Sequence, residues 1–321
     1  MKNLRYTVFA LSLLSLAACT QTQLTNYFTP IVDIDVPPHV PKLVMQADWS
    51  VGSDSLSVMV SRSRGALDTG TYFNQKRIDT VGNAKVELLR DGKVVATMPY
   101  FQDGFHYLRG GYKLDTTAGL SYTLRVSCPT LPTVEATQIT PKTAKIRKVA
   151  FNKDGATKTD PLDLFNGRPK SKIVDEYVVE FDDVVNADNF YSVSVLIEYA
   201  ATGQLQKLEL GSLDDIAESN MLQDKTFQNK TFSWRLWSGQ FKGGRGGGPG
   251  GQNNNPVIGS GDKITFYLRS MTADQYLFRK SLDLYKQTNI FSEPVILHTN
   301  VKNGYGIFTT QAVTTAKLTV P

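Results

Sequence analysis

Apolar and polar side chains alternate over residues 42–141 in short runs separated by turn residues. Residues 56–61 alternate with the two-residue period of a strand, and residues 85–97 form two such runs around Asp91-Gly92. An Asp-Gly pair favours a two-residue hairpin turn, in which both residues take a positive φ. Residues 112–115 and 122–126 continue the pattern, each shortly after a glycine. Short strands with turn residues between them predict an antiparallel sandwich over residues 42–141.

A second β-rich domain is predicted over residues 146–321. Three prolines, Pro129, Pro132 and Pro141, precede it and place the boundary near residues 141–146. Within it, six runs have the composition of strands: 145–151, 176–182, 191–198, 206–210, 231–237 and 263–269. The predicted fold class is mainly β, with an immunoglobulin- or transthyretin-like antiparallel sandwich followed by a second β-rich domain with one or two packed helices.

Two helices are predicted inside the second domain. The segment Ser212-Leu-Asp-Asp215 has the spacing of a capping box, in which a hydroxyl and a carboxylate satisfy free amides at a helix start. Residues 272–287 place Phe278, Leu282 and Tyr285 at positions i, i+4 and i+7. This spacing predicts a helix with one buried face.

The segment 239–261 stands out because glycine and asparagine dominate it. Such a composition cannot supply a core and predicts a loop between two strands, either a surface insertion or a contact segment. It contains the spacing Gly-x-Gly-x-x-Gly at residues 246–251, but no βαβ unit surrounds it, which argues against a dinucleotide site.

An aromatic strand directly precedes this loop. Alternation directs Phe232, Trp234 and Leu236 to one face and Arg235 and Trp237 to the other. Trp237 and Arg235, together with Arg245 in the loop, are the candidate ligand or partner contacts. Packing at the edge of the core is the alternative for Trp237.

The N-terminus has the pattern of an export signal. Residues 1–18 combine a basic start with a short apolar stretch and end on Leu-Ala-Ala before Cys19. This ending is typical of bacterial lipoproteins, in which the cysteine is acylated; an ordinary signal peptide with an incidental cysteine is the alternative. Residues 19–41 are then a lipidated cysteine and a Pro-rich tether. A lipid bilayer would be the partner of the acylated Cys19.

Charge and cysteine content narrow the class of protein. The formal net charge is +5, and loss of Lys2 and Arg5 with residues 1–18 leaves +3, which is too small to indicate nucleic-acid binding. The chain has 2 cysteines, Cys19 and Cys128, so acylation of Cys19 would leave Cys128 without an intramolecular partner. No disulfide is therefore expected to hold either domain.

Residues that could perform catalysis or bind a metal are sparse in this sequence. The 3 histidines, His39, His106 and His298, belong to no recognisable catalytic motif and are expected to be structural or solvated. Alternation places Glu176, Glu180 and Asp182 on one strand face, which is typical of a solvated surface. Asn152-x-Asp154-Gly155 lacks the further oxygen ligands of a calcium loop. We expect no enzyme activity, no cofactor and no metal.

Three triplets of an acid, a hydroxyl residue and a methyl-bearing residue are similar to the O-glycosylation sequence of Bacteroidota. They are centred on Ser55, Thr80 and Thr116.

Two resemblances add to these inferences. The order Ala-x-Val-x-Leu, Asp-Gly, Gly-Tyr-x-Leu and Gly-x-x-Tyr-x-Leu-x-Val between residues 84 and 126 resembles transthyretin-like and carboxypeptidase-regulatory-like modules, which are usually structural. The C-terminal pattern Phe-x-x-Pro followed by Asn-x-x-Asn-Gly-x-Gly-x-Phe, at residues 291–294 and 300–308, resembles a Bacteroidota outer-membrane lipoprotein family of undetermined function.

Genes of that family typically lie beside TonB-dependent receptors. The resemblance therefore implies a non-enzymatic accessory or ligand-capture subunit of a TonB-dependent uptake system, with that receptor as a partner. An adhesin or structural envelope component is the alternative, and a surface hydrolase is the least favoured function. Residues 20–25 contain no acid, which leaves both the surface and the periplasmic face of the outer membrane open.

Overall fold

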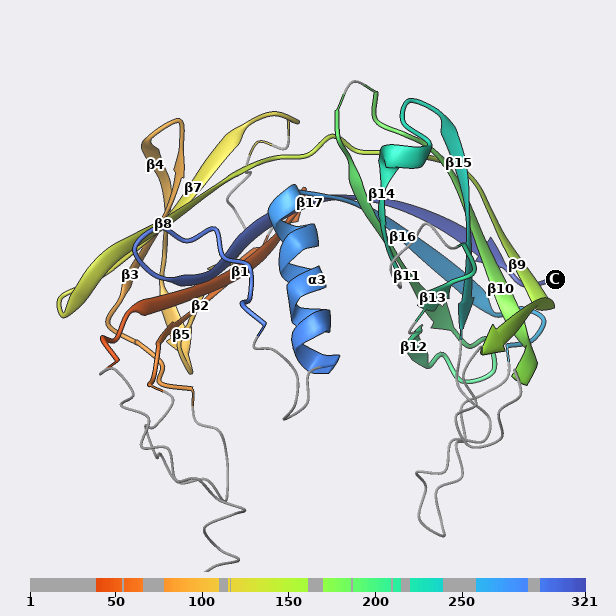
Figure 1. Ribbon diagram of the computed structural model, residues 1–321, viewed down its shortest axis with the longest axis horizontal. Helices are drawn as coiled ribbons and strands as arrows, with labels where there is room; N and C mark the ends of the chain where they lie inside the picture. The colour runs from red at the N-terminus through yellow and green to blue at the C-terminus, as the bar shows by residue number, and fades with distance from the viewer. Residues whose placement is uncertain are drawn as a thin grey trace, which may run out of the picture. The chain divides into compact units, whose positions relative to one another are not determined.

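The computed structural model describes residues 39–53, 55–65, 78–109, 115, 117–160, 170–185, 187–208, 210–214, 220–238, 258–287 and 295–321 (Figure 1). The predicted signal and nearly all of the predicted tether lie outside these residues, as do residues 239–257 of the Gly-rich segment. Pro41–Pro321 form one compact unit. Its architecture is mainly β, as predicted.

The first half of the unit supplies eight strands, which enter two sheets. They are β1 (Leu43–Val51), β2 (Ser55–Arg62), β3 (Lys85–Arg90), β4 (Lys93–Met98), β5 (Tyr100–Gln102), β6 (Phe105–Arg109), β7 (Ser121–Cys128) and β8 (Leu131–Ile139). A four-stranded sheet has the order β4-β3-β7-β8. The remaining strands of this half join a larger sheet.

The second half supplies nine more strands and two helical segments. They are β9 (Lys145–Asp160), β10 (Lys170–Asp182), β11 (Phe190–Glu198), β12 (Leu205–Leu208), β13 (Leu210–Ser212), β14 (Met221–Gln223), the 3-10 turn η1 (Asp224–Thr226), β15 (Thr231–Ser238), β16 (Lys263–Met271), α3 (Ala273–Gln287) and β17 (Tyr305–Thr319). A second four-stranded sheet has the order β13-β15-β10-β9. The single run predicted at 206–210 is in fact divided between two sheets, with β12 in one and β13 in the other.

A nine-stranded sheet connects both halves of the unit. Its order is β12-β11-β16-β17-β1-β2-β6-β5, with β14 paired to β11. The join is the parallel pair of β1 and β17, which brings Val44 opposite Tyr305 and Val51 opposite Ala312. The sheet therefore runs across the predicted boundary at 141–146. The two halves share backbone hydrogen bonds, which sequence periodicity cannot show because it reports only local conformation.

Alternating side chains build two separate cores between the large sheet and the small ones. In β1 the side chains of Leu43, Met45, Ala47 and Trp49 are buried, while Gln46 and Asp48 face the other side. The first core joins β1, β2 and β6 to β3, β4, β7 and β8. The second joins β11 and β16 to β10 and β15. Cys128 is half-buried at the end of β7 and its thiol is free of any disulfide.

The predicted hairpin is confirmed. Asp91 and Gly92 connect β3 and β4 with φ angles of 51° and 77°. Both residues thus take the positive φ that a two-residue hairpin turn requires, and the right-handed strand twist favours this turn.

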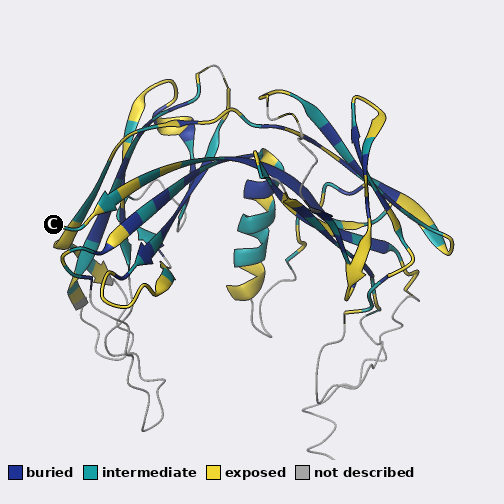
Figure 2. Cartoon of the chain, turned by 180° about the vertical axis from the view of Figure 1, so that it is seen from behind, coloured by how far each residue is buried: buried dark blue, intermediate teal, exposed yellow. Residues whose placement is uncertain are grey.

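The prediction for the long helix is right in position but wrong about its buried face. Helix α3 buries Gln275 and Tyr276 near its start, whereas Tyr285 is 54% exposed. Figure 2 shows the helix changing from buried at one end to exposed at the other. Tyr276 packs against Phe190 at 4.8 Å between ring centroids, in a small cluster with Met221 and Met271. Only the first turns of the helix contact this cluster. The row of Phe278, Leu282 and Tyr285 therefore does not form a buried face.

Ser212 ends β13 and its hydroxyl accepts the amide of Asp214, two residues on. Asp215 and residues 216–219 lie outside the described residues, so the second helix stays a prediction. In the part of the chain that the structure describes, no helix has the length and apolar character needed to cross a bilayer.

Candidate functional site

The outer face of the β13-β15-β10-β9 sheet carries the two described residues that the sequence singled out as contacts. Along β15, Trp234 and Leu236 are completely buried, while Arg235 is exposed and Trp237 is half-buried. Alternation therefore predicted the facing of this strand correctly. We call Arg235, Trp237, Glu176, Asn152 and Lys158 the outer-sheet cluster.

Arg235 and Glu176 form the polar centre of the outer-sheet cluster. The Nε of Arg235 donates to Oε1 of Glu176 over 2.6 Å, and the side-chain amide of Asn152 donates to Oε2 over 2.7 Å. Burial raises the pKa of Glu176, but these hydrogen bonds outweigh it, so the pKa lies below its ordinary value. Both carboxylate oxygens are thus occupied and the Arg235 fork is held in one orientation.

The burial of Glu176 corrects the expectation of a solvated carboxylate face. Its side chain is only 7% exposed, because neighbours on β9 and β15 cover it. Glu180 and Asp182 on the same strand are only half-buried. Alternation gives the direction of a side chain but not the size of the side chains beside it.

Trp237 lies over a glycine of the neighbouring strand. Gly211 is its register partner on β13, and a Cβ on Gly211 would stand 2.5 Å from the indole Nε1. The ammonium of Lys158 lies 5.9 Å from the indole ring centroid, a cation–π distance. The arrangement offers an aromatic surface bordered by a cation and a fixed guanidinium, which suits stacking with hydrogen bonding at the rim.

The segment first compared with a calcium loop forms a β-bulge beneath this cluster. The β9–β10 register shifts between Val174 and Glu176, and Asp154 takes a φ of 52°. The amide of Asp154 donates to the carboxylate of Asp175 over 3.0 Å. Within the described residues, no group of three or more acidic, histidine or cysteine side chains could hold a metal ion.

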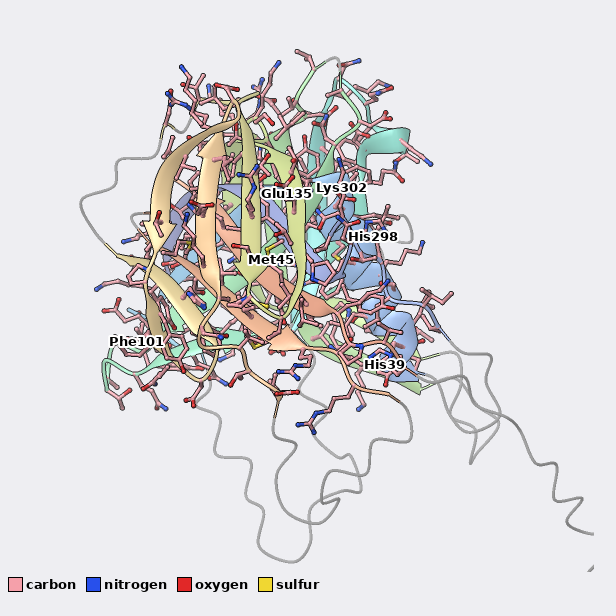
Figure 3. The ribbon with its side chains drawn as sticks, turned by 90° about the vertical axis from the view of Figure 1, so that its left-hand side faces the viewer. His39, Met45, Phe101, Glu135, His298 and Lys302 are labelled. Atoms are coloured by element: carbon pink, nitrogen blue, oxygen red, sulfur yellow. The ribbon has the colours of Figure 1, made fainter. Side chains whose placement is uncertain are left out.

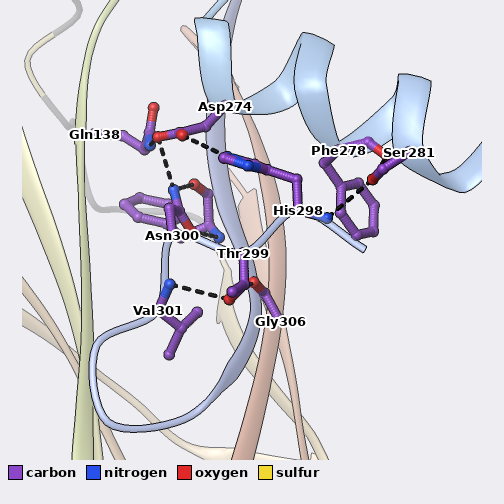
Figure 4. A network of polar contacts seen from close by, with 10 residues as sticks. Gln138, Asp274, Phe278, Ser281, His298, Thr299, Asn300, Val301 and Gly306 are labelled. Carbon is purple, nitrogen blue, oxygen red and sulfur yellow. Dashed lines mark hydrogen bonds and ion pairs between the residues drawn. The ribbon is translucent and has the colours of Figure 1, made fainter. Parts of the chain in front are cut away.

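A second polar network, which the sequence did not predict, surrounds the first turn of α3 (Figure 4). Asp274 accepts hydrogen bonds from Gln138 of β8 at 2.6 Å, His298 at 2.7 Å and Asn300 at 3.2 Å. Burial raises the pKa of Asp274, but the three donors together outweigh burial. The pKa of Asp274 therefore lies below its ordinary value. An ionised carboxylate only accepts, so Nε2 of His298 is the donor. The backbone amide of His298 donates to the Ser281 hydroxyl, which donates to Phe278.

Asn300 fixes the end of the same loop to β17. Its side-chain amide donates to the carbonyl of Phe308, and its Oδ1 accepts the Phe308 amide. Lys302 in turn donates its amide to the carbonyl of Glu135 on β8, and Figure 3 shows these two residues side by side. The motif Asn-x-x-Asn-Gly-x-Gly-x-Phe at 300–308 was the one sequence signal for this network. The geometry shows that the motif positions a loop, because Asn300 ties it to β17 and Lys302 ties it to β8.

Of the other sequence-predicted site residues, the two that the structure describes, Ser55 and Thr80, belong to neither place. Ser55 is exposed at the start of β2, and Thr80 is half-buried where it bridges to Ser61. Thr116, Cys19 and Arg245 lie outside the described residues. His106, expected to be structural or solvated, is completely buried, with Nδ1 3.3 Å from the Met98 carbonyl.

Comparison with known proteins places the chain in a family. The family model described as "Domain of unknown function (DUF4249)" matches residues 29–317, and the chain therefore belongs to this family. No curated protein matches the chain.

Proposed function

We propose that this member of the DUF4249 family is a non-enzymatic outer-membrane lipoprotein that serves as an accessory or ligand-capture subunit of a TonB-dependent uptake system. The lipoprotein pattern ending at Cys19 supports the anchor. The resemblance of residues 291–308 to Bacteroidota lipoproteins encoded beside TonB-dependent receptors supports the partner. The sandwich architecture on a shared sheet suits a binding scaffold rather than a deep catalytic centre.

The outer-sheet cluster is the single observation that carries the binding role. Trp and Arg are the residue types most enriched among energetically dominant contacts, and both occur on one exposed sheet face. The hydrogen bonds of Glu176 to Arg235 and Asn152 hold the polar rim in place before any partner arrives. Preorganised side chains lose little rotamer freedom on binding, which favours recognition.

The anchor determines where this face works. Acylation contributes ~0.8 kcal/mol per buried methylene, so several acyl chains on Cys19 would hold the protein on the membrane durably. Replacement of Cys19 by serine removes the acylation site and should release the protein into the soluble fraction. The same protein retained in the membrane fraction after Cys19→Ser would contradict the lipid anchor.

Crosslinking of the native protein in detergent-solubilised membranes tests the partner. We expect a crosslinked species containing a TonB-dependent receptor, lost in Trp237→Ala. Phe101→Ala is the matched control, because Phe101 is also an exposed aromatic residue but lies on β5 of the large sheet. Recovery of monomer alone would contradict the proposal. Loss of surface attachment on gene deletion, with nutrient uptake unchanged, would favour the adhesin instead.

A further inference from the structure

A pair of arginines gathers on the face of the nine-stranded sheet that α3 covers. Arg269 points from β16 to this face, and Arg279 reaches it from the second turn of α3. Asp48 on β1 is close enough to interact with the charges of both arginines. The helix lies beside β17, between the strands that carry Arg269 and Asp48 (Figure 1).

Hydroxyl groups on β11 complete this cluster. Arg269 Nη1 donates to the Ser194 hydroxyl over 2.6 Å, and Arg279 Nη1 donates to the Ser192 hydroxyl over 3.5 Å. Ser192 and Ser194 are 1% and 7% exposed, so their hydroxyls point from the sheet towards the guanidinium groups and not to bulk water. The other nitrogen of Arg279 lies 4.0 Å from the Asp48 carboxylate.

The charges in this cluster do not balance. Among the described residues, two guanidiniums face one carboxylate, which leaves a formal charge of one positive unit. Burial and the charge of Arg279 lower the pKa of Arg269, whereas Asp48 raises it. Arginine nevertheless stays protonated in proteins, so the two like charges persist side by side. Half-buried like charges are normally offset by an anion or by additional acceptors.

The two guanidiniums have more N–H donors than the contacts described above use. A guanidinium has five N–H donors arranged for a planar, bidentate acceptor. Among the described residues, the side-chain acceptor of Arg269 is the Ser194 hydroxyl, and Asp48 sits at the outer limit of an ion pair with Arg279. The Asp48 carboxylate also accepts hydrogen bonds from the side chains of Gln275 and Thr309.

Solvent can reach the cluster. The side chain of Arg279 is 33% exposed and that of Asp48 is 46% exposed, although the protein atoms around Asp48 raise its pKa. A small anion can therefore reach the Arg279 guanidinium from solvent.

We propose that Arg269, Arg279, Ser192 and Ser194 form an anion site that takes one carboxylate group of a small molecule or a peptide end. The single excess positive charge matches a monoanion, and the planar carboxylate matches the guanidinium fork. Asp48 is the internal competitor, because it pairs with the guanidinium that the ligand would use. The site is separate from the outer-sheet cluster, and it stands whether or not the chain binds a receptor.

Thermal unfolding of the detergent-solubilised full-length protein tests this site. A ligand that binds only the folded state raises Tm as its concentration increases. Sodium acetate is the probe, titrated against sodium chloride at equal ionic strength, with inorganic phosphate as a second probe. We expect acetate to raise Tm with saturation and chloride to leave it unchanged.

Two substitutions with opposite expected effects on the half-saturating acetate concentration test the site further. Arg279→Gln should raise the half-saturating acetate concentration about tenfold, because the variant loses one charge-assisted hydrogen bond to acetate. Asp48→Asn should lower it, because the internal competitor is gone. Arg90→Gln is the control: Arg90 pairs with Asp115 on the protein surface and should leave the titration unchanged.

Several results would overturn the proposal. Equal Tm shifts with acetate and chloride would show no specific site. An acetate response unchanged by both Arg279→Gln and Asp48→Asn would place any binding elsewhere. Saturation with phosphate but not with acetate would refute the carboxylate assignment.

Discussion

Gly306 on β17 lies so close to Met45 on β1 that a Cβ on the glycine would stand 2.0 Å from the Met45 carbonyl oxygen. The two residues are register partners in the parallel pair that joins the halves of the nine-stranded sheet. Gly306 also has a φ of 108°, which L side chains rarely adopt. Two independent constraints thus require glycine at the seam of the sheet.

Gly306→Ala should therefore be strongly destabilising. We expect a loss of about 3 kcal/mol or more in the free energy of unfolding, because backbone strain and a backbone clash add. Urea denaturation measures it. Gly119→Ala is the control, with a φ of 88° but open space around its Cβ, and should lose only about 1–2 kcal/mol. Similar losses for the two variants would show that the close approach to Met45 has no energetic weight.

The carboxylate of Asp274 should make stability depend on acid pH. Its folded pKa is below the ordinary value, so its stabilising contribution is present above the unfolded pKa, about 4, and is lost as pH falls through the folded pKa. Asp274→Asn should cost about 1–2 kcal/mol at pH 7, and the difference from the wild type should shrink towards pH 3.

Urea midpoints between pH 7 and pH 3 measure this effect. Asp283→Asn on the same helix is the matched control, since Asp283 is 47% exposed and pairs with Lys286 at 3.9 Å. A constant difference between wild type and Asp274→Asn at every pH would contradict an ionic role for Asp274.

The predictable part of the fold is local, and the unpredicted part joins distant segments. Alternation along residues 231–237 gave the correct faces of Trp234 and Arg235, and Asp91-Gly92 gave the correct turn. The pairing of β1 with β17 joins residues some 260 positions apart, for example Val44 and Tyr305, and no local pattern reports it. The sequence did not predict the Asp274 network for the same reason, because its donors Gln138 and His298 come from other segments of the chain. The buried state of Glu176 depended on neighbours from two other strands.

The ion pair of Arg235 and Glu176 should be energetically coupled, unlike most surface pairs. Glu176 is 7% exposed, so removal of either partner leaves a covered charge or donor without its complement. A double-mutant cycle with alanine at both positions should give a coupling of about 1 kcal/mol or more. The control pair is Lys263 and Glu198, which are 57% and 46% exposed at 3.1 Å. Its coupling should stay below about 0.5 kcal/mol, and equal values for both pairs would contradict a structural role for Glu176.

Gly211 should control the position of the Trp237 ring. A Cβ at residue 211 would stand 2.5 Å from the indole Nε1, so Gly211→Ala must push the ring outward. The chain has 3 tryptophans, and Trp49 and Trp234 are completely buried, so acrylamide quenching reports on Trp237. We expect stronger quenching in Gly211→Ala, and weaker quenching in the control Trp237→Phe. The receptor crosslink should fall in Gly211→Ala because the aromatic surface is displaced while Arg235 and Glu176 are retained. Unchanged quenching would show that the indole does not rest on Gly211.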